Sequence, residues 1–90
     1  MKQKTDLGLF KIQGIIIPSS WNEEGRVLSV AVSTFDEEEY LVEKDTKGDQ
    51  LLEQLRKEVE VSGLVRIDEG VKRIRVKKHG LIKEPDRSIS

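Results

Sequence analysis

Residues 58–78 carry the pattern that most restricts the fold, because apolar and polar side chains alternate there on both sides of a short turn. A period of two places every second side chain on the same face of a β-strand. EVEVSGLVRI (58–67) and VKRIRVKK (71–78) therefore predict two strands joined by a tight turn at DEG. The positions expected to face the core are Val59, Val61, Gly63, Val65, Ile74 and Val76.

Three earlier segments predict further strands. In LFKIQGIII (9–17), a bulge or tight bend is expected at Gly14, and Pro18 should end the strand because it lacks a backbone N–H. VLSVAVSTF (27–35) and EYLVE (39–43) are separated by an acidic turn and predict a hairpin. Inward positions are expected at Phe10, Ile12, Gly14, Ile16, Leu28, Val30, Val32, Tyr40 and Val42, whereas Ser29, Ala31 and Ser33 should face outward.

A short helix is expected between the third and fourth strands. Asp49 is the predicted N-cap, since its carboxylate can accept a free backbone N–H at the helix start. Leucines at helical spacing follow over about ten residues, and Glu53 and Lys57 form an i,i+4 pair. A helix this short is marginal alone in water, so Leu51, Leu52 and Leu55 must pack on something.

The composition indicates one small folded domain. The 90 residues are 36% hydrophobic and 37% charged, which is typical of a globular chain with a highly charged surface. The sequence has no apolar run of membrane-spanning length, and it has no cysteine for a disulfide or thiolate metal site, so a cytoplasmic protein is expected. We expect a domain at 9–82, a flexible N-terminal arm at 1–8 and a C-terminal tail at 83–90.

Five short amphipathic strands with one helix after the third follow the pattern of the OB-fold, a five-stranded Greek-key barrel of all-β class. The stretch LLEQLRKEVEVSGLV resembles the helix of that family running into its fourth strand. The resemblance extends over residues 9–82 and concerns architecture only, without a catalytic or binding signature. It implies that the fifth strand lies between the third and the fourth. An SH3-like barrel is the rival, but it does not usually carry a leucine-striped helix at this place.

The charge is unevenly distributed along the chain. Residues 1–63 carry a net charge of −5 and residues 64–90 a net charge of +4, within a total of −1. The cations of the last strand can form cross-strand ion pairs with acidic neighbours, or they can bind an anion. In the barrel that the resemblance implies, Arg73, Arg75 and Lys77 would stand between Glu39 and Glu43 on one side and Glu58 and Glu60 on the other.

The register of the last two strands bears on this choice. If Glu69 and Gly70 are the central turn residues, Val65 faces Ile74, and Arg66 then faces Arg73. Like charges directly opposed are unfavourable. The conflict could be relieved by Asp68 or Glu69, or by an anion that both arginines bind, and both alternatives stay open.

OB-folds bind oligonucleotides on the face of strands 2 and 3 and through the loops joining strands 1–2 and 4–5. That face offers few aromatic side chains here and carries Glu39 and Glu43, which counts against it. Trp21 lies in the first loop, either as a lid on the barrel or as a base-stacking side chain. The residues expected to contact nucleic acid are Trp21, Arg26, Arg66, Lys72, Arg73, Arg75 and Lys77.

Catalytic and metal-binding motifs are not apparent in the sequence. His79 is the single histidine, and neighbouring carboxylates in the DEEE turn point to opposite faces of an extended segment, so they do not converge on one ion. We expect a non-enzymatic module without a cofactor that binds single-stranded DNA or RNA weakly and without sequence preference. The alternative is a protein-interaction or accessory subunit that docks through Ile15 and Ile17, Leu41 or Leu64.

Overall fold

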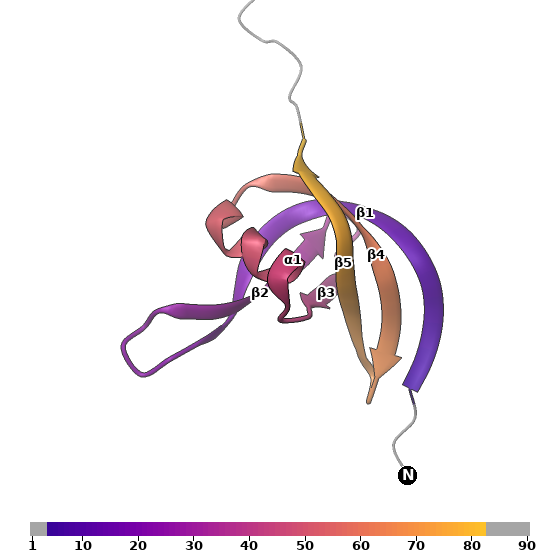
Figure 1. Cartoon of the computed structure of the whole chain (residues 1–90), viewed down its shortest axis with the longest axis horizontal. Coiled ribbons are helices and arrows are strands. Elements are labelled where there is room, and N and C mark those ends of the chain that lie inside the picture. The colour runs from indigo at the N-terminus through magenta and orange to yellow at the C-terminus, as the bar shows by residue number, and fades with distance from the viewer. Residues whose placement is uncertain (1–3, 83–90) are drawn as a thin grey trace, which may run out of the picture.

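The computed structural model describes residues 4–82, so the predicted tail at 83–90 and the first three residues of the predicted arm lie outside it. Five strands and one short helical segment follow the expected order. The elements are β1 (Lys4–Trp21), β2 (Val27–Thr34), β3 (Glu39–Val42), α1 (Thr46–Asp49), a 3₁₀ turn η1 (Gln50–Gln54), β4 (Glu58–Asp68) and β5 (Val71–Leu81). The protein is therefore mostly β, with a single helical segment between β3 and β4 in the described part (Figure 1).

The strands form one mixed sheet whose order of pairing, β1-β2-β3-β5-β4, closes on itself. β1 makes this closure possible because it pairs with β4 over its first part and with β2 over its second. In Figure 1 it arches over the other strands from the N-terminal end to the projecting β1–β2 hairpin. The pairing of β3 with β5 is parallel and the others are antiparallel. The predicted place of the fifth strand, between the third and the fourth, is confirmed.

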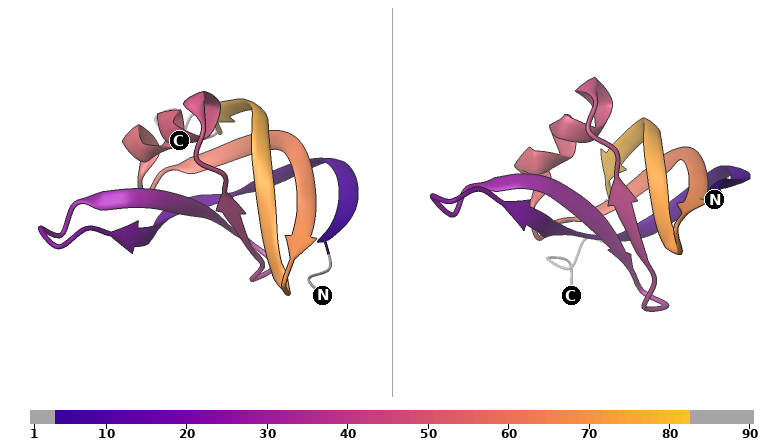
Figure 2. Two further views of the ribbon diagram at one scale, coloured as in Figure 1. Left: turned by 60° about the horizontal axis from the view of Figure 1, so that its bottom comes forward. Right: turned by 90° about the horizontal axis from the view of Figure 1, so that it is seen from below.

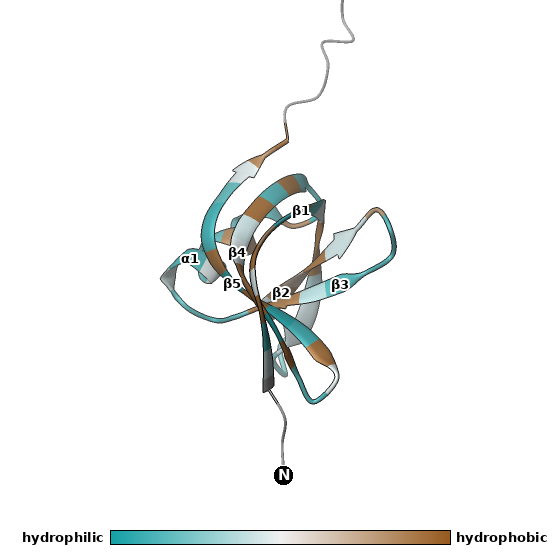
Figure 3. Ribbon diagram, turned by 90° about the vertical axis from the view of Figure 1, so that its right-hand side faces the viewer, coloured by the Kyte–Doolittle hydropathy of each residue, from teal (hydrophilic) through white to brown (hydrophobic). Residues whose placement is uncertain are grey.

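The core lies inside this sheet and follows the alternation seen in the sequence, which Figure 3 shows as bands of hydropathy along the strands. All six inward positions predicted on β4 and β5 are buried. Three predictions on β1 and β2 were wrong: Phe10 and Leu28 are exposed, and Ala31 is buried. Ala31 is covered because it pairs with Ile17 on one side and Leu41 on the other.

β1 is longer than predicted at both ends. It begins at Lys4, so residues 4–8 of the expected arm are paired with β4, and it continues through Pro18 to Trp21. Pro18 is tolerated for a geometric reason. The N–H of Ile16, two residues earlier, points away from β2 to the carbonyl of Lys57, so by alternation the nitrogen of Pro18 also points away from β2. Because β1 has left β4 by this point, the missing N–H removes no ladder hydrogen bond.

Of the bulge or tight bend predicted at Gly14, the bulge is absent, since the register runs through Gly14 without a shift. A Cβ atom there would lie 2.2 Å from the carbonyl oxygen of Ser33, so a close approach of β2 explains the glycine. The bulges lie instead between Asp6 and Gly8, between Pro18 and Trp21, and between Ser62 and Gly63.

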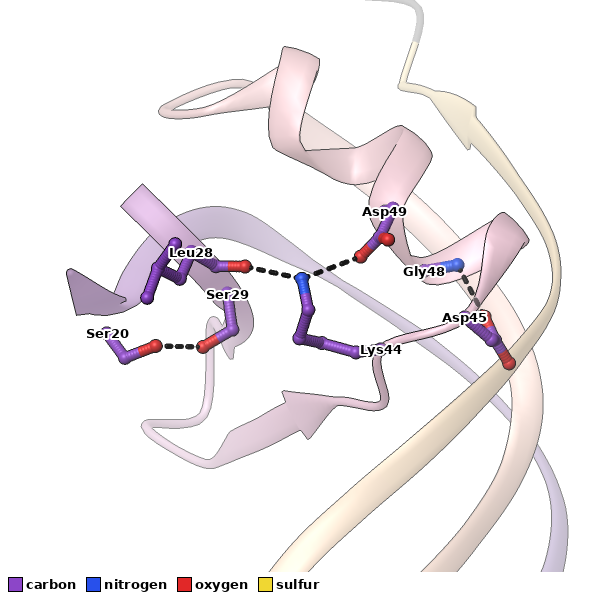
Figure 4. Close-up of polar contacts among 7 residues, drawn as sticks. All are labelled: Ser20, Leu28, Ser29, Lys44, Asp45, Gly48 and Asp49. Carbon is purple, nitrogen blue, oxygen red and sulfur yellow. Dashed lines mark hydrogen bonds and ion pairs between the residues drawn. The ribbon is translucent and has the colours of Figure 1, made fainter. Parts of the chain in front are cut away.

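The helical segment starts earlier than predicted. Its N-cap is Asp45, whose side chain accepts a hydrogen bond from the N–H of Gly48 at 2.8 Å (Figure 4). Asp49 occupies the N-cap position of the 3₁₀ turn η1, but its side chain accepts from Lys44 and makes no capping bond. The helical turns end at Gln54, which leaves Lys57 outside the helix and removes the predicted pair with Glu53. The leucine prediction is confirmed, because Leu51 is fully buried and Leu52 and Leu55 pack against the core.

This cap can be tested by substitution. We expect Asp45→Ala to lower the free energy of unfolding by about 1 kcal/mol, because the N–H of Gly48 loses its acceptor. Asp45→Asn keeps an acceptor oxygen and should cost less. Asp49→Ala is the matched control, and its loss should be smaller because the Lys44–Asp49 pair is exposed. Urea titration followed by circular dichroism measures all three, and an equal loss for Asp45→Ala and Asp49→Ala would contradict the assignment.

Candidate nucleic-acid interface

The β4–β5 turn fixes the positions of the basic residues. Glu69 and Gly70 both have positive φ angles, of 55° and 82°, as a two-residue hairpin turn requires. With this turn, Val65 pairs with Ile74 and Arg66 pairs with Arg73. The predicted register is therefore confirmed, and two arginines do stand opposite each other across the strands.

Two carboxylates lie beside these arginines. Glu43 forms an ion pair with Arg66, with 2.9 Å between its carboxylate and Nη2, and it lies 3.9 Å from Nε of Arg75, while Asp68 lies 3.9 Å from Nε of Arg73. Glu43 reaches this place because its own N–H donates to the carbonyl of Ile74, at the parallel contact of β3 with β5. Opposite charges thus offset the repulsion between Arg66 and Arg73.

The predicted ion-pair ladder is only partly present. Arg75 does pair with Glu43, but Glu60 accepts from the side chain of Gln13 instead of from a cation. Lys77 is the extra residue of the β5 bulge, since Val76 pairs with Gly63 and Lys78 with Ser62. Within residues 4–82, Lys77 forms no ion pair.

Hydrogen-bonding capacity remains on the arginine pair. The Nε atoms of Arg66 and Arg73 and Oδ1 of Asp68 are buried, and none has a hydrogen-bond partner among the described residues. A guanidinium carries five N–H donors in a planar fork, so each arginine can serve a carboxylate and a second acceptor together.

A groove of about 350 Å³ connects these arginines with the base of the β1–β2 hairpin. Its polar lining includes three cations and two carboxylates, which leaves one net positive charge. At the hairpin base, the hydroxyls of Ser20 and Ser29 share a hydrogen bond of 2.6 Å, and Nζ of Lys44 donates to the carbonyl of Leu28 at 2.8 Å (Figure 4). The lining residues are Ser19, Ser29, Val30, Leu41, Val42, Glu43, Lys44, Arg66, Asp68 and Arg73.

Trp21 and Arg26 flank the β1–β2 loop. The loop is shaped by Asn22, whose Oδ1 accepts from the N–H groups of Glu24 and Arg26, both at 2.9 Å. Trp21 is 56% exposed and does not belong to the core, which removes the alternative of a lid. The hairpin projects on the side away from the β4–β5 turn (Figures 1 and 2), so the two predicted groups of site residues lie apart, and neither Trp21 nor Arg26 lines the groove.

Lys72 is engaged with the acidic β2–β3 turn. Its ammonium forms an ion pair with Glu38 and lies 5.4 Å from the centroid of the Tyr40 ring. The hydrogen bond to Glu38 raises the pKa of Lys72 above its ordinary value, so the side chain stays charged at neutral pH. Lys72 therefore contributes to the packing of the two turns, which counts against its predicted role with phosphate.

The sequence did not predict which residues outside the β4–β5 hairpin complete the groove. Ser19, Ser29 and Lys44 carried no signal that separated them from ordinary loop and strand residues, because their proximity depends on how far β1 extends. Glu43 was expected on the outer face of β3, and the parallel pairing of β3 with β5 could have identified its partner.

Three further observations complete the description of residues 4–82. No three side chains of the ligand types His, Cys, Asp or Glu gather there in a way that could hold a metal ion. The described helical segments are too short to cross a membrane. Comparison with protein-family models, with curated proteins and with solved structures finds no match to this chain.

Proposed function

We propose that this chain is an OB-fold barrel that binds single-stranded nucleic acid weakly and without sequence preference. The proposal is supported by the closed strand order, with β5 between β3 and β4 and the helical segment before β4, which is the arrangement expected of that Greek-key fold. It is further supported by the groove, because its lining comes from β2, β3, the base of the β1–β2 loop and the β4–β5 hairpin. These are the surfaces through which OB-folds bind oligonucleotides.

The observation that carries the proposal is the pair of opposed arginines in this groove. Arg66 and Arg73 each retain a buried Nε–H without a partner among the described residues. The side chains of Arg66 and Arg73 are 33% and 38% exposed, so their terminal N–H groups can donate charge-assisted hydrogen bonds to a phosphate oxygen. Phosphate contacts position the nucleic-acid strand but do not recognise its base sequence.

Trp21 supplies the second element of such a site. An exposed indole offers a flat face on which any base can stack, and Arg26 lies in the same hairpin. Glu43 and Asp68 limit the affinity, because they hold the arginines that a phosphate would bind. Binding that depends on one net charge in the groove should be weak and should fall as salt rises.

Fluorescence anisotropy of a labelled single-stranded oligonucleotide, titrated with protein at low and at moderate salt, tests the proposal. We expect binding at low salt that weakens as salt rises. Trp21→Ala should reduce the binding free energy by ~1–3 kcal/mol, because the stacking surface is lost. Phe35→Ala is the control, since Phe35 is also an exposed aromatic residue but lies in the β2–β3 turn instead of in the β1–β2 hairpin.

The same titration, applied to a Glu43 variant, tests whether the arginines contact phosphate. Glu43→Gln removes the carboxylate that holds Arg66 and Arg75, so it should tighten binding if those cations contact phosphate. Circular dichroism checks that the variant is folded. Absence of binding at low salt, or unchanged affinity in both Trp21→Ala and Glu43→Gln, would overturn the proposal.

A protein-docking function is the second candidate, and one observation favours it. Of the apolar residues expected to dock a partner, Ile17 and Leu41 are partly buried, whereas Ile15 and Leu64 are exposed, and Leu64 lies beside Leu9. Two adjacent exposed leucines on a sheet face are typical of an interaction surface when charged residues surround them.

A further inference from the structure

The outer face of β1, β4 and β5 carries a pair of exposed leucines. Leu9 pairs directly with Leu64, and Leu64 pairs with Arg75, so the three side chains lie in one row across the sheet. Leu9 is 69% exposed and Leu64 is 43% exposed. Neither leucine lines the groove, but Leu64 and Arg75 line a neighbouring depression together with Glu43 and Arg66, so the row borders the groove.

Lysines occupy the next row. Lys11 pairs with Ser62 and Ser62 with Lys78, and the bulge places Lys77 beside them. All three lysines are exposed, and within residues 4–82 none of them forms an ion pair. We call Leu9, Lys11, Leu64, Lys77 and Lys78 the basic strip.

The β2–β3 turn has the opposite character. Phe35 is 61% exposed, and the exposed carboxylates of Glu37 and Glu39 form no ion pair in the described part of the chain. Asp36 accepts a hydrogen bond from the Thr34 hydroxyl and keeps its charge outward, since it is exposed. We call Phe35, Asp36, Glu37 and Glu39 the acidic turn.

The basic strip and the acidic turn adjoin on one molecule. Thr34, at the end of β2, pairs with Gly14 of β1, which brings the turn alongside the preceding residues of β1. A shallow depression of about 400 Å³ is lined by Lys11 and Gln13 together with Phe35 and Asp36. A surface that holds an apolar-basic patch next to an apolar-acidic patch is complementary to a second copy of itself after rotation by a twofold axis.

We propose that the chain forms a twofold-symmetric dimer in which the acidic turn of each copy lies on the basic strip of the other. Phe35 contacts Leu9 and Leu64 in this dimer. The carboxylates of the acidic turn pair with Lys11, Lys77 and Lys78, three charges against three. The symmetry makes each contact twice, which is how a small self-complementary patch can hold two molecules.

A second copy of the chain fits the basic strip better than nucleic acid does. The basic strip contains no aromatic side chain on which a base could stack, and the neighbouring acidic turn would repel phosphate. The dimer is independent of the nucleic-acid proposal, because Trp21 and the groove arginines take no part in it.

Sedimentation velocity of the full chain over a range of concentrations tests the dimer. The wild type should shift from the mass of one chain to that of two as concentration rises, and salt should weaken the shift. Two double variants, here called the reversal variants, reverse the charge of one patch each. The first carries Glu37→Lys and Glu39→Lys in the acidic turn, and the second carries Lys77→Glu and Lys78→Glu in the basic strip. Each variant alone should dimerise roughly tenfold more weakly or not at all, because like charges would then face each other.

A mixture of the two reversal variants gives the decisive result. In the mixed dimer a basic turn lies on an acidic strip, and an acidic turn lies on a basic strip, so both contacts are again complementary. We expect the mixture to regain the mass of two chains, with circular dichroism confirming that both variants are folded. A wild type that stays monomeric at every concentration, or a mixture that stays monomeric, would overturn the proposal, as would dimerisation unaffected by either reversal.

Discussion

Replacing Leu51 with alanine is expected to lower the free energy of unfolding by ~2–5 kcal/mol. Leu51 is fully buried in the core, and it comes from the 3₁₀ turn η1 instead of from a strand. Removal of its side chain therefore leaves a cavity where the helical segment meets the inner faces of the strands, and the closed sheet can collapse into it only partly. Small domains have ~5–15 kcal/mol of stability in all, so this loss is a large share.

Urea denaturation followed by circular dichroism measures this effect. Leu28→Ala is the matched control, because it removes the same atoms from a side chain that is 41% exposed. We expect the control to lose less than about 1 kcal/mol. If the two variants lost equal stability, Leu51 would not have the role in the core that its burial indicates.

The β4–β5 hairpin shows how much a sequence can predict when the contacts are local. Its period of two and its two-residue turn together determined the register, down to the opposed Arg66 and Arg73. A one-residue slip would have turned every valine of β4 outward, so burial of the core permits a single answer. The same alternation placed the core positions of both strands correctly.

The ends of β1 could not be predicted in this way. Whether Pro18 ends a strand depends on which side of that strand still has a partner, and this is decided by β4, about forty residues away in the sequence. The helix start was wrong for a related reason. Gly48 precedes the predicted start, yet it belongs to the helical segment, where close packing leaves no room for a side chain: a Cβ atom would lie 2.1 Å from the carbonyl oxygen of Glu43.

The candidate site depends on local contacts, which the sequence predicts, and on contacts between distant segments, which it does not. The opposed arginines follow from the hairpin, whereas Glu43, which holds Arg66, is placed by the parallel contact of β3 with β5. The sequence left open whether the cations of β5 pair with acidic neighbours or bind a ligand, and the structure shows that several of them form ion pairs. Lys72 is the clearest case, because it joins the two turns through Glu38.

Replacing Gly63 with alanine is expected to cost about 3 kcal/mol or more, the upper range for adding an atom to a packed interior. Gly63 is buried on the inner face of β4, beside the β4–β5 bulge. A Cβ atom there would lie 2.2 Å from the carbonyl oxygen of Arg75 and 3.0 Å from a side-chain carbon of Ile74. The oxygen belongs to the backbone of the paired strand, so relief requires β5 to move away from β4. Urea denaturation measures the loss.

Gly80→Ala is the control because it adds the same methyl group to the same hairpin. Gly80 lies in β5 opposite Glu60, and a Cβ atom there would meet no atom within 4 Å. Alanine at this position should leave stability unchanged or raise it by ~0.5 kcal/mol, since the unfolded chain loses freedom. If Gly63→Ala were as harmless as Gly80→Ala, the close approach of the two strands would be disproved. A large loss confined to Gly63 would instead support the close approach of β5 to β4 at this position, where the carbonyl oxygen of Arg75 leaves no room for a side chain.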